Sequence, residues 1–132
     1  MPKNTARRSA DALPLLDRAL ALDPRDPGRS VYLQYQCRAY LVLGRYDDAI
    51  ASCEKSIALE SWWLRYLFLV AAYAQKGDYE KSAAAKAELM RLYPGLTIAS
   101  HRRHEVTNVP LALEQTETHF YAGLRKAGIP EQ

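Results

Sequence analysis

A stretch of 33 residues occurs twice in succession, and it limits what this chain can fold into more than any other feature. The first copy centres on Tyr40-Leu-Val-Leu-Gly44-Arg-Tyr46, and the second on Tyr73-Ala-Gln-Lys-Gly77-Asp-Tyr79. Each of these tyrosines and glycines returns 33 positions later. Repetition at this period is typical of stacked helix–turn–helix units, in which each unit buries its apolar face against the next.

Apolar residues recur three and four positions apart on both sides of each glycine, which is the spacing of an amphipathic helix. The pattern predicts four helices, at about 31–43, 46–59, 62–75 and 79–92. Gly44 and Gly77 fall where one helix ends and the chain turns, a place that favours a left-handed backbone. Acidic residues at 47, 48, 78 and 80 stabilise the starts of the helices that follow. The sequence therefore predicts an all-α chain of helical hairpins.

Small side chains mark the positions at which the helices of each unit are expected to approach closely. They are Cys37, Ala39, Ala49 and Cys53 in the first copy, and Ala72, Ser82 and Ala85 in the second. The pattern resembles the tetratricopeptide repeat (TPR), whose consensus is W-x2-L-G-x2-Y, then A-x3-F and a final proline. Pro94 keeps the last position in the second copy. The chain departs from the consensus at Leu33, Cys37, Ser61, Tyr66 and Val70.

The resemblance implies one TPR-like domain over residues 1–132, a right-handed solenoid of helical hairpins. It would contain about two and a half repeats and a C-terminal capping helix. Its units are a half repeat at 9–24, full repeats at 30–61 and 62–94, and a capping segment at 96–128. A half repeat exposes a helix face that normally has a neighbour. We therefore expect the tail of a longer protein, or a piece of one, unless the first helix serves as its own cap.

Two further helices are predicted to flank the repeats. The first runs from Ser9 to Leu22, and it tolerates Pro14 only within or close to its first turn. The closing helix runs from Asn108 to Ala127, where Asn108 caps its start and Gly128 with Pro130 ends it. Such a helix would cover the open end of the solenoid.

The stretch 96–105 is interpreted as a short basic helix that Thr97 can cap. His101 and His104 lie three residues apart and could touch one ion, but no third ligand is signalled. We therefore interpret the stretch as a solvated charged face and expect no metal site. Trp62 and Trp63 are interpreted as packing against the preceding helices, with an exposed binding hot spot as the alternative.

Cys37 and Cys53 are the only cysteines, and they fall on facing helices of the first hairpin. A disulfide is therefore geometrically open to them. We expect instead two buried, reduced thiols that pack as small apolar side chains. Neither cysteine has a CxxC partner or a histidine on its own helix, which argues against a metal or redox site.

The formal net charge of +3 and the hydrophobic fraction of 48% are ordinary for a globular chain. So mild a charge does not indicate a nucleic-acid partner, which requires a concentrated basic face. No apolar run reaches the length of a membrane span, and the first residues lack the apolar core of a signal peptide. We expect a cytoplasmic protein that binds neither nucleic acid nor membrane.

Three segments together resemble a narrower group of proteins. They are Ala19-Leu-Ala-Leu-Asp-Pro-Arg-Asp-Pro27, Tyr93-Pro-Gly-Leu-Thr-Ile98 and Gly123-Leu-Arg-Lys-Ala-Gly-Ile-Pro-Glu131. They look like the C-terminal repeat region of bacterial multidomain regulators. In those, a class III adenylate/guanylate cyclase domain or a winged-helix DNA-binding domain precedes the repeats. Because none of the cyclase's own motifs occurs here, the resemblance implies a regulatory or assembly segment rather than a catalyst.

The chain carries no phosphate-binding loop, nucleophile elbow or set of metal-ligand residues at ligand spacing, so we expect neither enzyme activity nor a cofactor. The first helix of each unit should line a concave surface. The candidate partner-binding residues on it are Tyr35, Arg38, Leu64, Phe68 and Gln75. The expected occupant is a protein or peptide, such as a partner's amphipathic helix or the chain's own closing helix. A stand-alone adaptor or a homodimerising scaffold is the alternative function.

Overall fold

The structure, a computed structural model, describes residues 5–103 and 114–132, and every regular element in these ranges is a helix. The elements are α1 (Thr5–Leu22), α2 (Arg29–Val42), α3 (Tyr46–Leu59), α4 (Trp63–Lys76), α5 (Tyr79–Leu92), α6 (Ile98–Arg102), the π-helix η1 (Thr116–Tyr121) and α8 (Ala122–Lys126). The all-α prediction is confirmed for this part of the chain. Among the described helices, none has both the length and the apolar character needed to cross a bilayer.

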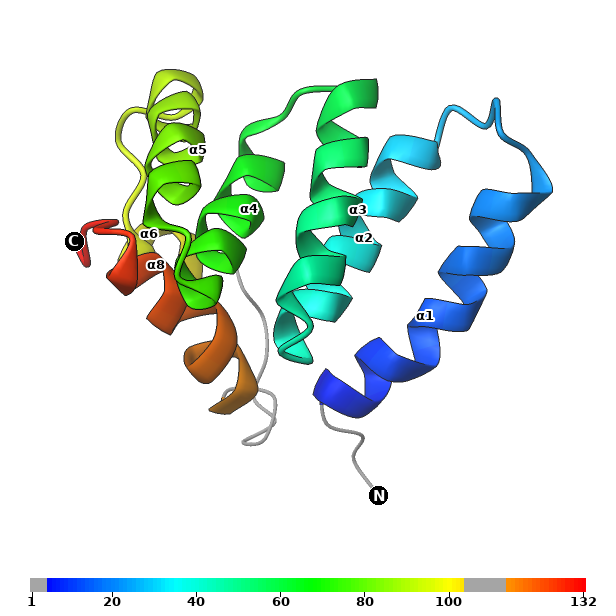
Figure 1. Ribbon diagram of the computed structural model, residues 1–132, viewed down its shortest axis with the longest axis horizontal. Helices are drawn as coiled ribbons and strands as arrows, with labels where there is room; N and C mark the ends of the chain where they lie inside the picture. Colours follow the sequence, from blue (N-terminus) through cyan, green and yellow to red (C-terminus); the bar gives the residue numbers. More distant parts are fainter. Residues whose placement is uncertain (1–4, 104–113) are drawn as a thin grey trace.

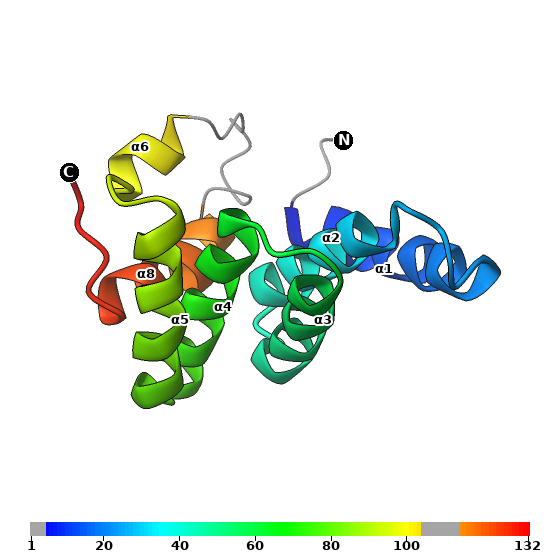
Figure 2. The same ribbon diagram turned by 90° about the horizontal axis from the view of Figure 1, so that it is seen from above.

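Consecutive helices pack against one another along the chain. α2 packs on α3, α4 packs on α5, and α3 joins the two hairpins by packing on α4. In Figure 1 these helices stand side by side, from α1 on the right to α5 on the left. Seen from above, α6 and α8 lie beside α4 and α5, at the end of the row away from α1 (Figure 2). The arrangement is a row of helical hairpins, as the internal repeat predicts.

Two glycines make the turns inside the hairpins. Gly44, between α2 and α3, has φ of 79°, and Gly77, between α4 and α5, has φ of 89°. Both angles lie in the left-handed region, which costs glycine little because it has no Cβ. Asp78 then caps α5, since its side chain accepts a hydrogen bond from the backbone N–H of Lys81. The predicted turn positions are therefore confirmed.

Cys37 on α2 and Cys53 on α3 form a disulfide, so the expectation of two reduced thiols was wrong. Their Cα atoms lie 5.4 Å apart, a separation that a disulfide bridges without moving the backbone. Ala49, one turn before Cys53, is fully buried and lets the two helices approach closely. The repeat pattern placed the cysteines on facing helices but could not fix the distance between those helices.

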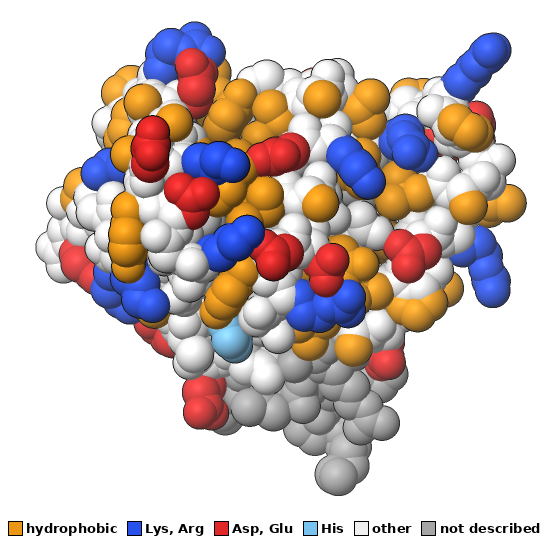
Figure 3. All heavy atoms as spheres, viewed as in Figure 1, with side chains coloured by type: hydrophobic (Ala, Val, Ile, Leu, Met, Phe, Trp, Pro, Cys, Tyr) orange, Lys and Arg blue, Asp and Glu red, His pale blue; other side chains and the backbone are white. Residues whose placement is uncertain are grey.

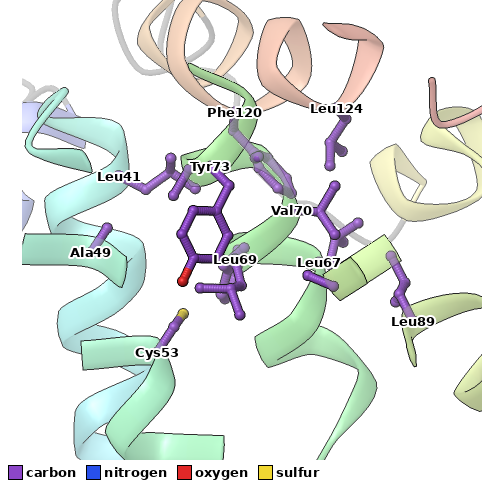
Figure 4. Close-up of a cluster of buried hydrophobic side chains, with 14 of the residues drawn as sticks. Leu41, Ala49, Cys53, Leu67, Leu69, Val70, Tyr73, Leu89, Phe120 and Leu124 are labelled. Carbon is purple, nitrogen blue, oxygen red and sulfur yellow. The ribbon is translucent and has the colours of Figure 1, made fainter. Parts of the chain in front are cut away.

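The main hydrophobic core lies between the two hairpins and extends to the last helices of the chain. It includes Leu41, Ala49, Cys53, Leu67, Leu69, Val70, Tyr73, Leu89, Phe120 and Leu124 (Figure 4). The ring of Tyr73 fills the space beside α3, and its hydroxyl donates a hydrogen bond to the Glu54 carboxylate. Burial, reinforced by this carboxylate, raises the pKa of Tyr73. Tyr73 thus joins the two repeat units.

α1 begins at Thr5 rather than Ser9, and it carries Pro14 in its interior rather than in its first turn. Proline has no N–H to donate to the carbonyl one turn earlier, which weakens a helix at that point. Pro14 is exposed, so water can satisfy the freed carbonyl. α1 packs on α2 and buries Leu13, while Leu15 and Leu22 remain exposed.

Residues 116–129, which we name the closing segment, comprise η1, α8 and the turn that follows. A π-helical stretch replaces an inner part of the regular helix expected here, and it buries both Phe120 and Tyr121. Gly128, with φ of 84°, ends α8 as predicted. The Lys86 ammonium donates to the carbonyl oxygens of residues 127 and 128, which ties this turn to α5. The predicted start of the closing helix at Asn108 lies outside the described residues.

Candidate functional site

The repeat relates three positions of α2 to three positions of α4. Val31, Tyr35 and Arg38 correspond to Leu64, Phe68 and Ala71, each 33 residues later. We name these two sets the α2 inner face and the α4 inner face. Together with Gln75 they include every partner-binding residue that the sequence predicts. The structure treats the two faces differently, because one is covered and the other is open.

The closing segment covers the α4 inner face. The rings of Phe68 and Phe120 meet edge to face, with their centroids 5.5 Å apart. Gly123 lies against Ala71 so closely that a Cβ on Gly123 would come within 2.7 Å of the Ala71 carbonyl oxygen. Phe68 is only 4% exposed as a result. Of the two occupants considered for this part of the concave surface, the structure shows the chain's own C-terminal helix.

Gln75 fastens the closing segment by its polar side chain. Its Nε2 donates to the carbonyl oxygens of Thr118, at 2.8 Å, and His119, at 3.0 Å. The Lys126 ammonium donates to Gln75 Oε1 at 2.7 Å. The hydrogen bonds from Nε2 join α4 to backbone carbonyl groups of η1. Gln75 therefore binds a segment of its own chain.

The α2 inner face is open in comparison. Tyr35 is 54% exposed, against 4% for its repeat equivalent Phe68. Val31 is also exposed, one turn before Tyr35, and Arg38 follows about one turn after it. Within the described parts of the chain, Arg38 forms no hydrogen bond or ion pair. An apolar residue, an aromatic residue and a cation thus lie in line on one helix face at i, i+4 and i+7.

A buried arginine on α4 forms a hydrogen bond to α2. Arg65 on α4 is 2% exposed; its Nε donates to Gln34 Oε1 at 2.9 Å, and its Nη1 donates to the carbonyl oxygen of Glu60. Burial lowers the pKa of the guanidinium, and the Glu60 charge opposes that shift. A buried cation is tolerated only when its donors are satisfied, so this network fixes the position of α2 against α4.

Further polar side chains continue this network between α1, α2 and α3. Ser56 Oγ donates to the carbonyl oxygen of Ser30 at 2.6 Å, and Ser52 Oγ donates to Gln36 Oε1 at 2.8 Å. Gln36 Nε2 donates in turn to Asp17 Oδ1 at 2.7 Å. One sequence feature could have indicated this polar network. Gln34 in the first copy stands where the second copy has the apolar Leu67.

The turn between α2 and α3 meets the closing segment through a tyrosine–histidine pair. The hydroxyl of Tyr46 and Nδ1 of His119 lie 2.6 Å apart, and the His119 ring lies next to Gly44. Burial lowers the pKa of His119 and raises the pKa of Tyr46, so the neutral forms of both are favoured.

An aromatic cluster surrounds His101. The rings of Trp63 and Phe120 lie 6.2 Å and 5.4 Å from it, and Trp63 also meets Tyr93 at 4.9 Å. His101 is buried, so its assignment to a solvated charged face was wrong. α6 itself forms as predicted, with Thr97 as its N-cap. His104 lies outside the described residues, and no group of three or more metal-ligating residues occurs in the ranges that the structure describes.

The two tryptophans differ in environment. Trp63 packs on Tyr93 and His101, which follow it in the chain rather than precede it. Trp62 is 44% exposed, and the guanidinium carbon of Arg65 lies 5.8 Å from the centre of its ring. On the face shown in Figure 3, basic and acidic side chains are interspersed with apolar ones. Exposed ion pairs in the described chain include Lys76–Asp47 and Arg45–Asp48.

Comparison with known proteins gives one match. The model of the family described as the CadC C-terminal domain matches residues 16–108. Because this match spans well over half of the chain, the protein belongs to that family. No curated protein and no solved structure matches the chain.

This membership corrects both resemblances drawn from the sequence. The family is neither the TPR family nor that of the cyclase-type regulators, and those assignments were wrong. A 33-residue period with Gly-x-Tyr turns arises wherever two similar helical hairpins stack, so it identifies the hairpins and not the family. The departures at Leu33, Cys37, Tyr66 and Val70 fall at the consensus positions that distinguish the TPR from other hairpins.

Proposed function

We propose that this member of the CadC C-terminal domain family is a regulatory segment of a larger signalling protein, and that it acts by binding another protein segment on the α2 inner face. Membership in the family supports the regulatory part of the proposal. The difference between the two inner faces supports the binding part. At equivalent positions Tyr35 is 54% exposed and Phe68 is 4% exposed.

That difference is the observation on which the proposal rests. The α4 inner face demonstrates that a helix fits this kind of surface, since the closing segment occupies it. The α2 inner face presents residues of similar spacing with nothing described upon them. Val31, Tyr35 and Arg38 lie at i, i+4 and i+7, so they form one stripe along α2 against which an amphipathic helix could lie.

The proposal assigns no catalytic role to the chain. The polar side chains inside the molecule bond to one another between helices, as Arg65 does to Gln34 and Ser52 to Gln36. They hold helices together instead of converging on a cavity where a substrate could react.

The disulfide supports an oxidising compartment for this domain, in place of the cytoplasm expected from the sequence. Cys37 and Cys53 are both fully buried in the bonded state. Disulfides persist in oxidising compartments and are rare where cellular thiols keep cysteines reduced. Acid-quenching the cells and labelling free thiols with a maleimide in denaturant tests this. Denaturant exposes both buried cysteines, and the proposal expects no labelling of either until a reductant is added.

Site-specific photocrosslinking tests the proposed binding. A photoreactive phenylalanine analogue replaces Tyr35 in cells that naturally produce the protein. The matched control places it at Tyr79, which lies on α5 and is similarly exposed. We expect a defined covalent adduct, identified by mass spectrometry, from position 35 and none from position 79. Absence of an adduct at position 35, or equal adducts at both positions, would refute the proposal.

A further inference from the structure

The way the closing segment packs on the α4 inner face indicates what kind of helix the α2 inner face can bind. On α4, the closing segment crosses the helix at Ala71, where Gly123 makes the closest approach. Phe120, three residues before Gly123, supplies the aromatic anchor on Phe68. Two small residues at the crossing point allow the helix backbones to come close together.

The crossing point is where the two faces differ in chemistry. Ala71 has Arg38 as its repeat equivalent on α2. An arginine cannot permit the close approach that Ala71 allows, so a helix on α2 must lie further out. A guanidinium enclosed between two helices also requires an anionic partner or several acceptors, because burying an unpaired charge is costly.

No described residue already supplies that anion. Arg38 forms no ion pair within the described ranges. Asp17 on α1 and Glu117 in the closing segment have other partners, since Asp17 accepts from Gln36 and Glu117 pairs with Arg102 and Arg125. The charge of Arg38 is therefore available to an incoming carboxylate, which a guanidinium binds in a bidentate manner.

We propose that the α2 inner face binds a partner helix that carries an aspartate or glutamate at its crossing position, three residues after an apolar or aromatic anchor. The anchor packs on Tyr35 and Val31, as Phe120 packs on Phe68, and the carboxylate pairs with Arg38. This proposal rests on the proposed function, because it specifies the partner of the same face.

Peptides copied from the closing segment provide the probe. Residues 114–129 are synthesised with a fluorescent label and with Gly123→Glu, which places a carboxylate three residues after Phe120. The matched peptide carries Gly123→Lys. Fluorescence anisotropy measures the binding of each peptide to the intact protein, to Arg38→Glu, and to Lys55→Glu. The last variant makes the same change of net charge at an exposed position on α3.

We expect the Gly123→Glu peptide to bind the intact protein about ten-fold more tightly than the Gly123→Lys peptide, since like charges oppose each other at the crossing. Arg38→Glu should invert this preference, and Lys55→Glu should leave it unchanged. Equal affinity of the two peptides, loss of preference in both variants, or no binding of either peptide would overturn the proposal. A position-35 photoadduct that is insensitive to Arg38→Glu would overturn this inference and leave the proposed function standing.

Discussion

Reducing the disulfide should lower the stability of the fold by a predictable amount. Cys37 and Cys53 are 16 residues apart in the sequence. In the chain-entropy description, a cross-link that closes a loop of this length stabilises the folded state by about 3 kcal/mol, because it restricts the unfolded chain. For a domain of this size, that loss corresponds to a melting temperature lower by roughly 10 °C.

The assay compares thermal and urea unfolding of the oxidised and reduced protein. Since both cysteines are fully buried, reduction is carried out in denaturant and the protein is refolded in the presence of reductant. Thiol titration of an aliquot in denaturant should give no free thiol in the oxidised sample and two in the reduced one. The Cys37→Ala/Cys53→Ala double variant is the control, and reductant should not change its midpoint.

Two results would refute this reasoning. If the protein purified without reductant contains two titratable thiols, the disulfide does not form. If the disulfide forms but the oxidised and reduced proteins unfold at the same midpoint, the bond does not contribute to stability in the way the loop length requires.

Three further perturbations test individual parts of the fold. Gly77→Ala should cost about 1–2 kcal/mol because its φ is 89°, whereas Gly95→Ala, with open space around it, should be nearly neutral by urea denaturation. Phe120→Ala should cost about 3–5 kcal/mol because the ring is buried, and exposed Thr118→Ala should change the urea midpoint little; equal midpoints would contradict the packing described. Burial lowers the pKa of His119 below the ordinary histidine value of about 6.5, so the unfolded chain takes up the proton at higher pH than the folded protein does. The free energy of unfolding should therefore fall as the pH drops through 6.5 toward the folded pKa, and His119→Gln should flatten that slope in urea titrations.

The positions of the repeat helices could be predicted because local patterns determine them. Apolar spacing located α2 to α5 closely, and Gly44 and Gly77 marked the turns through their need for positive φ. Tyr40 and Tyr73 could be recognised as equivalent positions because they lie 33 residues apart in the repeat.

Features that depend on the distance between helices could not be predicted in the same way. The Cys37–Cys53 bond requires a Cα separation that no sequence spacing reveals. In the sequence, Arg65 interrupts the apolar run that begins at Trp62. It is nevertheless buried, because Gln34 and the Glu60 carbonyl oxygen accept hydrogen bonds from its guanidinium. His101 reads as part of a basic surface, but neighbouring rings enclose it.

The candidate site, too, could be predicted from the sequence only in part. The sequence placed Tyr35, Arg38, Phe68 and Gln75 on one kind of surface, because the repeat relates α2 to α4. It could not decide which part of that surface the closing segment covers, since this depends on the approach of Gly123 to Ala71. The family was also misassigned, because stacked hairpins share a period without sharing ancestry.

The most direct test of this account is a map of backbone amide chemical shifts in the ¹⁵N-labelled protein during titration with the Gly123→Glu peptide. The account predicts that the perturbed amides cluster on α2, around Val31, Tyr35 and Arg38, while amides of α5 remain unchanged. Perturbations centred on α5 or α1, with the amides of α2 unaffected, would contradict it.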